Sequence, residues 1–183
     1  MSADVRFPTA LQMVLSVALA DHDGFRCTSQ ILADGLGSNP SFIRKLLIPL
    51  TSEGMLVAAS GKGGGLHLGR PASEISLRDI YLAVTEQKKV LPARQDIPGR
   101  CRISANIGEF FGAVADEAET AMLDALAQRD VADSLAEVLR LDEVRVGRAT
   151  RDVGPAVAAQ TSPPLKGSPE PSPVRSKRRV GQA

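Results

Sequence analysis

The chain has 183 residues, which is enough for one ordinary domain and an additional segment. Its charge is divided, because residues 1–142 carry 14 basic and 18 acidic side chains, whereas residues 143–183 carry 8 basic and 3 acidic ones. An aromatic content of 3% argues against base stacking on single strands, two distant cysteines exclude a disulfide framework, and no apolar run is long enough to span a membrane.

Helical periodicity dominates the first 145 residues. One apolar face marks a first helix that ends near Asp21, and its residues are Phe7, Leu11, Val14, Leu15 and Ala18. Thr28 is placed to cap a short second helix, which we expect to bury Ile31 and Leu32. Asn39 and Pro40 then begin a third helix, with Pro at a position where it is tolerated. The buried side of this helix is predicted to be formed by Phe42, Leu46 and Leu50.

A short hairpin interrupts this series of helices. Residues 55–60 and 66–68 are strand-like and flank the glycine-rich stretch 61–65. Ser76 and Asp79 match a capping box at the start of a fourth helix, which ends near Glu86. A long helix over 106–127 and a last helix over 131–139 follow. Six of the 12 prolines lie beyond Gly147, so we predict a disordered, basic tail over 147–183.

The second and third helices have the features of a helix-turn-helix, since Gly37 permits a tight turn between them. The polar face of the third helix displays Ser41, Arg44 and Lys45, which are suited to base edges and phosphates. A hairpin directly after such a helix makes a winged helix. The basic residues of 39–70 outnumber the acidic ones by three, which favours a polyanionic partner. An ordinary solvated face with an unrelated hairpin is the alternative.

Other chemistry finds little support in the sequence. The stretch 61–65 is not a phosphate-binding P-loop, because no Ser or Thr follows Lys62 and the next element is a strand. No nucleophile is accompanied by a base, so we predict that the chain is not an enzyme. His22 has no second His or acidic partner at ligand spacing, nor does His67, and we expect both to be surface residues. The predicted fold is mainly α with a small β-hairpin wing.

The order of these motifs resembles the Rrf family of winged-helix transcriptional regulators. The resemblance covers about residues 5–140 and is most specific at the Gly-Lys-Gly-Gly-Gly wing and the following helix at 75–86. It implies a homodimer, paired through its long helices, that binds a palindromic site on double-stranded DNA and regulates transcription, as a repressor in our interpretation. By position, the residues expected to contact DNA are Thr28, Ser38, Ser41, Arg44, Lys45, Lys62, Gly63, Gly64, His67 and Arg70.

Cysteine usage departs from the family pattern. Members that bind an iron–sulfur cluster carry three cysteines before the dimerisation helix, and here Cys101 alone occupies such a position, with Gln95 and Lys89 in place of the others. We therefore predict no iron–sulfur cofactor. Cys101 lies between Arg100 and Arg102, which should favour its thiolate and suit a redox or electrophile sensor. A cysteine without a role is the alternative. A Cys27–Cys101 bridge stays open.

Small apolar residues on the long helix predict the dimer interface. They recur at spacings of 4, 3, 4 and 3 as Phe111, Ala115, Ala118, Met122 and Ala125. The alternative is that this stripe packs on its own chain.

We accordingly expect four segments: a DNA-binding domain over 1–87, a sensor loop over 88–105, dimerisation helices over 106–142 and the tail over 147–183. We expect the protein to be cytoplasmic and not bound to a membrane. Two other functions stay open, a winged-helix protein-interaction module and a regulator controlled by a small-molecule effector.

Overall fold

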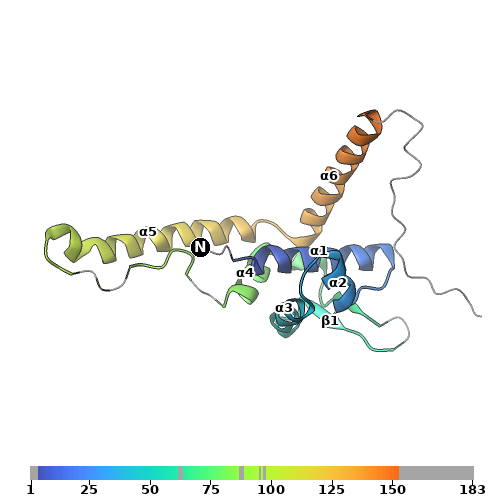
Figure 1. Cartoon of the computed structure of the whole chain (residues 1–183), viewed down its shortest axis with the longest axis horizontal. Coiled ribbons are helices and arrows are strands. Elements are labelled where there is room, and N and C mark those ends of the chain that lie inside the picture. The colour runs from blue at the N-terminus through green and yellow to red at the C-terminus, as the bar shows by residue number, and fades with distance from the viewer. Residues whose placement is uncertain (1–3, 62–63, 87–88, 95, 97, 153–183) are drawn as a thin grey trace, which may run out of the picture. The chain divides into compact units, whose positions relative to one another are not determined.

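The computed structural model describes residues 4–61, 64–86, 89–94, 96 and 98–152, the last six of them by their backbone alone. The fold is mainly helical with one small antiparallel sheet, as the sequence predicts (Figure 1). In chain order the elements are α1 (Arg6–Asp23), α2 (Ser29–Gly35), α3 (Pro40–Ser52), β1 (Leu56–Ala58), β2 (Leu66–Leu68), η1 (Ala72–Glu74), α4 (Leu77–Thr85), α5 (Arg102–Ala127) and α6 (Val131–Asp152). Two compact units, residues 1–142 and 143–183, divide the chain.

The starts of three helices are set by local side-chain hydrogen bonds, and the sequence predicts each of them. Thr28 Oγ1 accepts from the amide of Ile31 at 3.2 Å and caps α2. Asn39 Oδ1 caps α3 by accepting from the amide of Ser41 at 2.8 Å, and Pro40 occupies the first turn. At α4, Ser76 and Asp79 accept from each other's amides at 3.1 Å, which completes the expected capping box.

The wing, defined here as residues 56–68, is an antiparallel hairpin. Leu56 pairs with Leu68, Val57 with His67 and Ala58 with Leu66. Reciprocal hydrogen bonds between Ala59 and Gly65, at 2.8 and 3.0 Å, extend the pairing toward the tip. Lys62 and Gly63, which the sequence places at that tip, lie outside the described residues.

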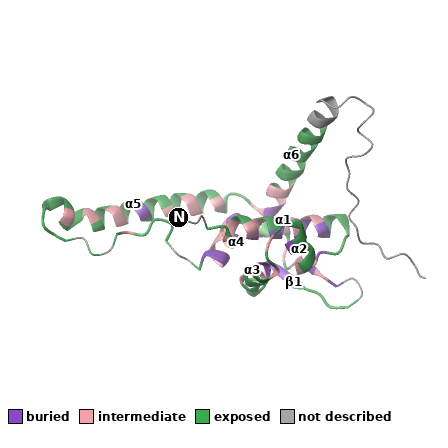
Figure 2. Cartoon of the chain, viewed as in Figure 1, coloured by how far each residue is buried: buried purple, intermediate pink, exposed green. Residues whose placement is uncertain are grey.

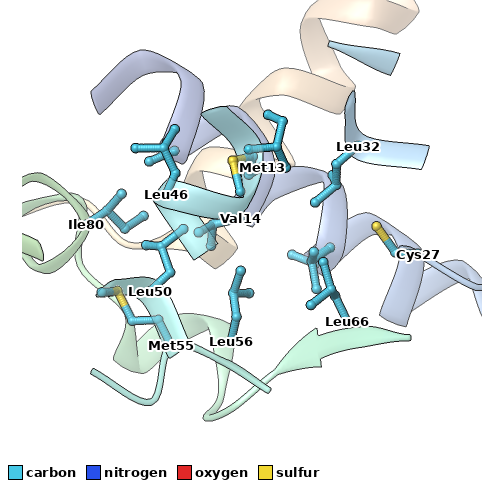
Figure 3. Close-up of a cluster of buried hydrophobic side chains, with 14 of the residues drawn as sticks. Met13, Val14, Cys27, Leu32, Leu46, Leu50, Met55, Leu56, Leu66 and Ile80 are labelled. Carbon is cyan, nitrogen blue, oxygen red and sulfur yellow. The ribbon is translucent and has the colours of Figure 1, made fainter. Parts of the chain in front are cut away.

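One hydrophobic core joins α1, α2, α3, α4 and the wing (Figure 3). Met13 and Val14 of α1, Leu50 of α3 and Leu56 of β1 have no exposed surface. The expected burial of α2 is half wrong, because Leu32 is buried as expected but Ile31 is 48% exposed. Ala33 is buried in the place of Ile31, since the short helix turns its Leu32–Ala33 edge toward the core.

The turn between α5 and α6 is attached to the start of α4. Leu77 donates its amide to the carbonyl of Arg129 at 2.9 Å, and Val131 donates to the carbonyl of Ile75 at 3.0 Å. The Val131 side chain is fully buried in the core, and α5 packs against α4. The last two helices are therefore linked to the winged helix by both backbone hydrogen bonds and apolar packing.

Both late helices are longer than predicted. α5 begins at Arg102, one turn before the expected Asn106, because Cys101 caps it: Cys101 Sγ accepts from the amide of Ser104 at 3.4 Å, and Ser104 Oγ accepts from the amide of Cys101 at 3.0 Å. α6 continues to Asp152, so residues 147–152 are helical where a disordered tail is predicted. Residues 153–183 lie outside the described part of the chain. Within that part, no helix is long and apolar enough to cross a membrane.

Candidate nucleic-acid interface

The candidate recognition helix α3 has one buried and one polar face. Ile43, Leu46 and Leu50 are buried, which fixes the helix against the core. Ser41, Arg44 and Lys45 are all exposed on its N-terminal half. A helix held this way can present its hydroxyl and cationic groups to a groove of DNA without first becoming ordered. The structure thus keeps these three predicted residues together and accessible.

Two other predicted contact residues have their hydroxyl groups in local hydrogen bonds. Thr28 Oγ1 caps α2, as described above. Ser38 Oγ donates to the carbonyl of Leu36 at 3.4 Å, and the Ser38 amide donates to the carbonyl of Ala33 at 2.9 Å. Both side chains are half-buried. Their observed contacts shape the helix-turn-helix, and contact with DNA stays a prediction for both.

The wing residues predicted to reach DNA are held by the rest of the chain. Gly64 is buried, and its carbonyl accepts from Arg26 Nε. His67 Nδ1 lies 2.6 Å from Asp21 Oδ1, and the His67 side chain is 38% exposed. The expectation that neither histidine has an acidic partner is therefore wrong. His22 Nδ1 lies 2.8 Å from Asp23 Oδ1, and the fold brings Asp21 to His67 from 46 positions away. The contacts of Gly64 and His67 orient the wing in the free protein.

Arg70 is also engaged within the chain. Its Nη2 donates to Asp79 Oδ2 at 3.0 Å, with both side chains partly exposed. The same Asp79 forms the capping box of α4, so Arg70 connects the segment that follows the wing to that helix. Asp79 therefore offsets the positive charge of Arg70. Among the described residues of 39–70, the remaining basic side chains are Arg44 and Lys45 of α3.

A second candidate site surrounds Cys101, at the start of α5. Its thiol is exposed and lines a cavity of about 450 Å³ between the preceding loop and the first three turns of α5. Pro92, Ile107 and Phe111 supply apolar walls, and Arg94 is the cationic residue in the lining. Hydrogen bonds from the Ser104 side chain and amide lower the pKa of the Cys101 thiol. The sequence attributes this effect to Arg100 and Arg102, but hydrogen bonds at the helix start cause it.

The other cysteine is in a different environment. Cys27 is 2% exposed and belongs to the core as a small buried residue. Burial raises the pKa of its thiol, and the negative charge of Asp21 raises it further. Both cysteines are free thiols in this structure. Cys27 is therefore protected from reagents in water, whereas Cys101 is accessible to them.

The predicted interface stripe on α5 is only partly accessible. Ala115 is 5% exposed and is the buried residue of this helix, whereas Ala118 and Ala125 are exposed and Phe111 and Met122 are intermediate. Ala115 is thus covered by its own chain, which agrees, at this position, with the alternative that the stripe packs on its own chain. Large apolar side chains are exposed elsewhere on α5, at Ile103 (72%), Phe110 (67%) and Val114 (45%).

Sequence reasoning misses two residues that hold the wing, Asp21 and Arg26. Asp21 lies in the last turn of α1, and Arg26 lies in the loop that follows. Their partners are 38 to 47 positions away, so no local spacing identifies them. The sequence signal that could have pointed to them is the cluster of charged residues at 21–26, directly before Cys27, where α1 ends and the chain turns.

Comparisons with known proteins agree with this fold. Residues 3–137 match the model of the Rrf2 family, which is described as an iron-dependent transcriptional regulator. YwnA of Bacillus subtilis, whose name describes an HTH-type transcriptional regulator, is 24% identical over 108 residues, covering 59% of this chain and 80% of YwnA.

Two solved structures have the same fold. One, from Lactobacillus plantarum and described as a transcriptional regulator, is 24% identical with a TM-score of 0.61, covering 74% of this chain and 91% of that one. IscR of T. potens is 16% identical with a TM-score of 0.57, covering 75% and 88%.

The donor residues needed for bound iron are poorly represented in this chain. Within the described residues, no group of three or more His, Cys, Asp or Glu side chains is arranged to hold a metal ion. An iron–sulfur cluster needs several thiolates, but Cys101 is the exposed thiol and Cys27 is enclosed in the core. The residues present at the Cys101 cavity therefore do not fit an iron–sulfur cluster.

Proposed function

Because the chain belongs to the Rrf2 family of DNA-binding transcriptional regulators, we propose that it binds a specific palindromic promoter site as a homodimer. The observation that carries this proposal is α3, which buries Ile43 and Leu46 while exposing Arg44 and Lys45 on its other face. Cationic groups on a fixed helix release counterions from DNA and read base edges at the same time. The protein acts in this proposal by binding in the cytoplasm, and not by catalysis.

The direct test is titration of the protein into labelled DNA from the region upstream of its own gene. We expect one protected site, with affinity that falls steeply as salt increases, because phosphate contacts displace counterions. A scrambled fragment of the same length is the control and should bind more weakly by a factor of about 10³ or more. Equal, salt-insensitive binding to both fragments, or none to either, contradicts the proposal and favours a protein-interaction module.

The homodimer is proposed to form through α5. Phe110 and Ile103 are more than half exposed on this helix, and large apolar side chains in such numbers mark protein interfaces. Ala118 lies on the same helix, is exposed and is small enough for a second helix to approach closely. A dimer also provides two copies of α3, which a palindrome requires at a separation of about 34–36 Å. Repression follows in this proposal because a dimer on a promoter excludes polymerase.

Control by oxidation or alkylation of Cys101 is the second part of the proposal. Its exposed thiol and lowered pKa favour the thiolate, which is the reactive form. Modification adds a polar or bulky group at the first turn of α5, next to the cavity lined by Ile107 and Phe111. We propose that this displaces the start of the dimerisation helix and so changes the spacing of the two α3 helices.

Operator affinity before and after peroxide treatment tests this control. The wild-type protein should lose affinity when oxidised and recover it with a thiol reductant, whereas Cys101→Ser should bind in both conditions. If the variant responds as the wild type does, Cys101 is not the sensor. The cavity of about 450 Å³ favours a second candidate, a non-covalent small-molecule effector, and that alternative predicts an effector response that survives in Cys101→Ser.

A further inference from the structure

The wing is attached to the segment between α1 and α2, which we call the joint and define as residues 21–28. Asp21 reaches β2 with both carboxylate oxygens. Oδ1 lies 2.6 Å from His67 Nδ1, and Oδ2 accepts from the amide of Leu68 at 2.8 Å. A single carboxylate therefore holds two successive residues of the strand, which fixes both its position and its tilt.

Backbone groups of the joint continue this attachment along the same strand edge. Leu66 donates its amide to the carbonyl of Cys27 at 2.8 Å, and Arg26 Nε donates to the carbonyl of Gly64. At Gly65 a Cβ atom would lie 2.4 Å from the Cys27 carbonyl oxygen, so only glycine permits this approach. Figure 3 shows Cys27 and Leu66 at the same end of the core.

The joint covers the edge of β2 that β1 leaves free. The amide of Gly65 donates to Ala59 on the β1 side, whereas the amides of Leu66 and Leu68 donate to the Cys27 carbonyl and the Asp21 carboxylate of the joint. A two-stranded hairpin is marginally stable alone in water, and its outer edge is normally solvated. Here that edge is satisfied by the Cys27 carbonyl and the Asp21 carboxylate, which lets a three-residue strand keep one conformation.

The same joint also sets the start of the helix-turn-helix. Thr28, which follows Cys27 directly, caps α2, and the Cys27 side chain is buried in the core between these attachments. The wing and the helix-turn-helix thus share one short segment of backbone. Their relative placement is determined there, and a DNA site has to be matched by both parts together.

We infer that Asp21, a residue outside the recognition helix and the wing, is a positioning residue for DNA binding. It holds the wing in the orientation in which the wing and α3 contact the same site, an inference that rests on the proposed DNA-binding function. The ordering of the wing is completed before DNA arrives, so the complex loses less conformational entropy on binding. Removing the Asp21 carboxylate leaves α3 in place and removes the attachment at His67 and Leu68, while the contacts of Leu66 and Gly64 remain.

The first test compares Asp21→Ala with Asp23→Ala. Asp23 is the matched control, because it is an acid at the same end of α1 and its Oδ1 lies 2.8 Å from Nδ1 of the adjacent His22. We expect Asp21→Ala to weaken operator binding by about tenfold, and Asp23→Ala to leave it within about twofold. Equal affinities of the two variants overturn the inference.

A second measurement separates a positioned wing from a general loss of stability. In the wild type, Lys62→Ala should weaken binding, because Lys62 is predicted to contact DNA from the wing. In the Asp21→Ala background the same substitution should cost clearly less, since the wing no longer reaches its site reproducibly. If Lys62→Ala costs the same factor in both backgrounds, Asp21 does not act through the wing and the inference is wrong.

Amide hydrogen exchange in the free protein tests the attachment independently of DNA. We expect the amide of Leu68, which loses its acceptor, to exchange faster in Asp21→Ala, while those of Ile43 and Leu46 in α3 keep their protection. Asp21→Asn retains a carbonyl acceptor for Leu68 and should lie between the two. Unchanged exchange at Leu68 overturns the inference even if DNA binding is confirmed. Faster exchange without any operator binding by the wild type supports the attachment and contradicts the proposed function.

Discussion

The winged helix buries most of its apolar side chains, whereas the long helix α5 leaves many of its own exposed (Figure 2). In the winged helix, α1 alone buries six residues, and the core is continuous from Ala10 to Val84. In α5, Ala115 is the buried residue among 26, and Ile103 and Phe110 are largely exposed. The winged helix therefore completes its core within one chain, whereas α5 is apolar in excess of what one chain covers.

The difference indicates which interactions stabilise each region. Burial of apolar surface stabilises a domain by roughly 25 cal/mol for each Å² removed from water. That contribution is already present in the winged helix of a single chain. Much of the apolar surface of α5 has no comparable contribution within one chain, which is why we propose dimerisation through this helix.

Substitution in the winged-helix core should give the largest effect on stability. Leu50 is fully buried in α3, so Leu50→Ala should lower the free energy of unfolding by about 2–5 kcal/mol. Urea denaturation at fixed protein concentration measures the change. Ile103→Ala on the exposed face of α5 is the control, and both variants are compared in an Ala118→Glu background, which is expected to be monomeric. There Ile103→Ala should change the free energy of unfolding by about 0.5 kcal/mol or less. Comparable losses for both variants would remove the contrast between the two regions.

A charge on α5 should break the association without unfolding the winged helix. Ala118→Glu places a carboxylate where a second helix is expected to pack, and an unpaired charge buried there costs several kcal/mol. We expect monomers in sedimentation velocity, loss of operator binding and an unchanged helical signal. Asp124→Glu, a conservative change on the same helix, should remain dimeric. A wild-type protein that sediments as a monomer contradicts the assignment directly.

Arg44→Ala tests whether the winged helix, and not α5 or α6, carries the DNA-binding surface. We expect specific DNA binding to weaken by about 1–3 kcal/mol and base preference to relax, because a groove contact is removed. Arg140→Ala is the matched control, since Arg140 lies on α6 and is paired with Glu137 at 2.6 Å. Anisotropy titrations with cognate and mutated operators measure both variants. If Arg140→Ala weakens binding as much as Arg44→Ala does, the DNA-binding surface lies elsewhere.

The smallest predicted effect concerns the reactivity of Cys101. Its lowered pKa means that the thiolate fraction below the ordinary thiol pKa exceeds that of an unperturbed cysteine. Ser104→Ala removes the side-chain hydrogen bond and should raise the pKa, so alkylation at pH 7 should slow by a few-fold. At pH 10, where both proteins are mostly thiolate, the rates should converge. If the ratio of the two alkylation rates is the same at all pH values, the two proteins differ in the accessibility of the thiol and not in its pKa.

Features that depend on neighbours in sequence are predicted well. The caps of α2 and α4 join residues three apart, and the Asn39–Pro40 start of α3 is equally local. These hydrogen bonds form within one helical turn, so the residue types and their spacing are sufficient to predict them. The glycine-rich hairpin between two strand-like segments is equally local. Apolar periodicity predicts the helices α1 and α3, but only part of their buried faces. Met13 and Val17 are fully buried in α1 where Leu11 and Leu15 are expected, and Ile43 is buried in α3 where Phe42 is expected.

Predictions that depend on distant residues are the ones that need correction. His67 and Arg70 look like free basic residues of a wing, yet they are paired with Asp21 and Asp79. The stripe through Ala115 looks uniformly available, yet the middle of it is covered by its own chain. The early start of α5 is a different case, because the Cys101–Ser104 cap is local but uses a thiol, which is not one of the common capping groups.

The amino-acid pattern alone is enough to predict the winged-helix class, the polar face of α3 and the absence of the usual cluster cysteines. Each of these follows from residue types and short spacings, which do not depend on how the chain folds. Only the tertiary structure decided which charged groups of the wing are already paired and how Asp21 joins β2. The contacts of Asp21 connect residues 46 and 47 positions apart, and their geometry exists only after the core has brought α1 beside the hairpin.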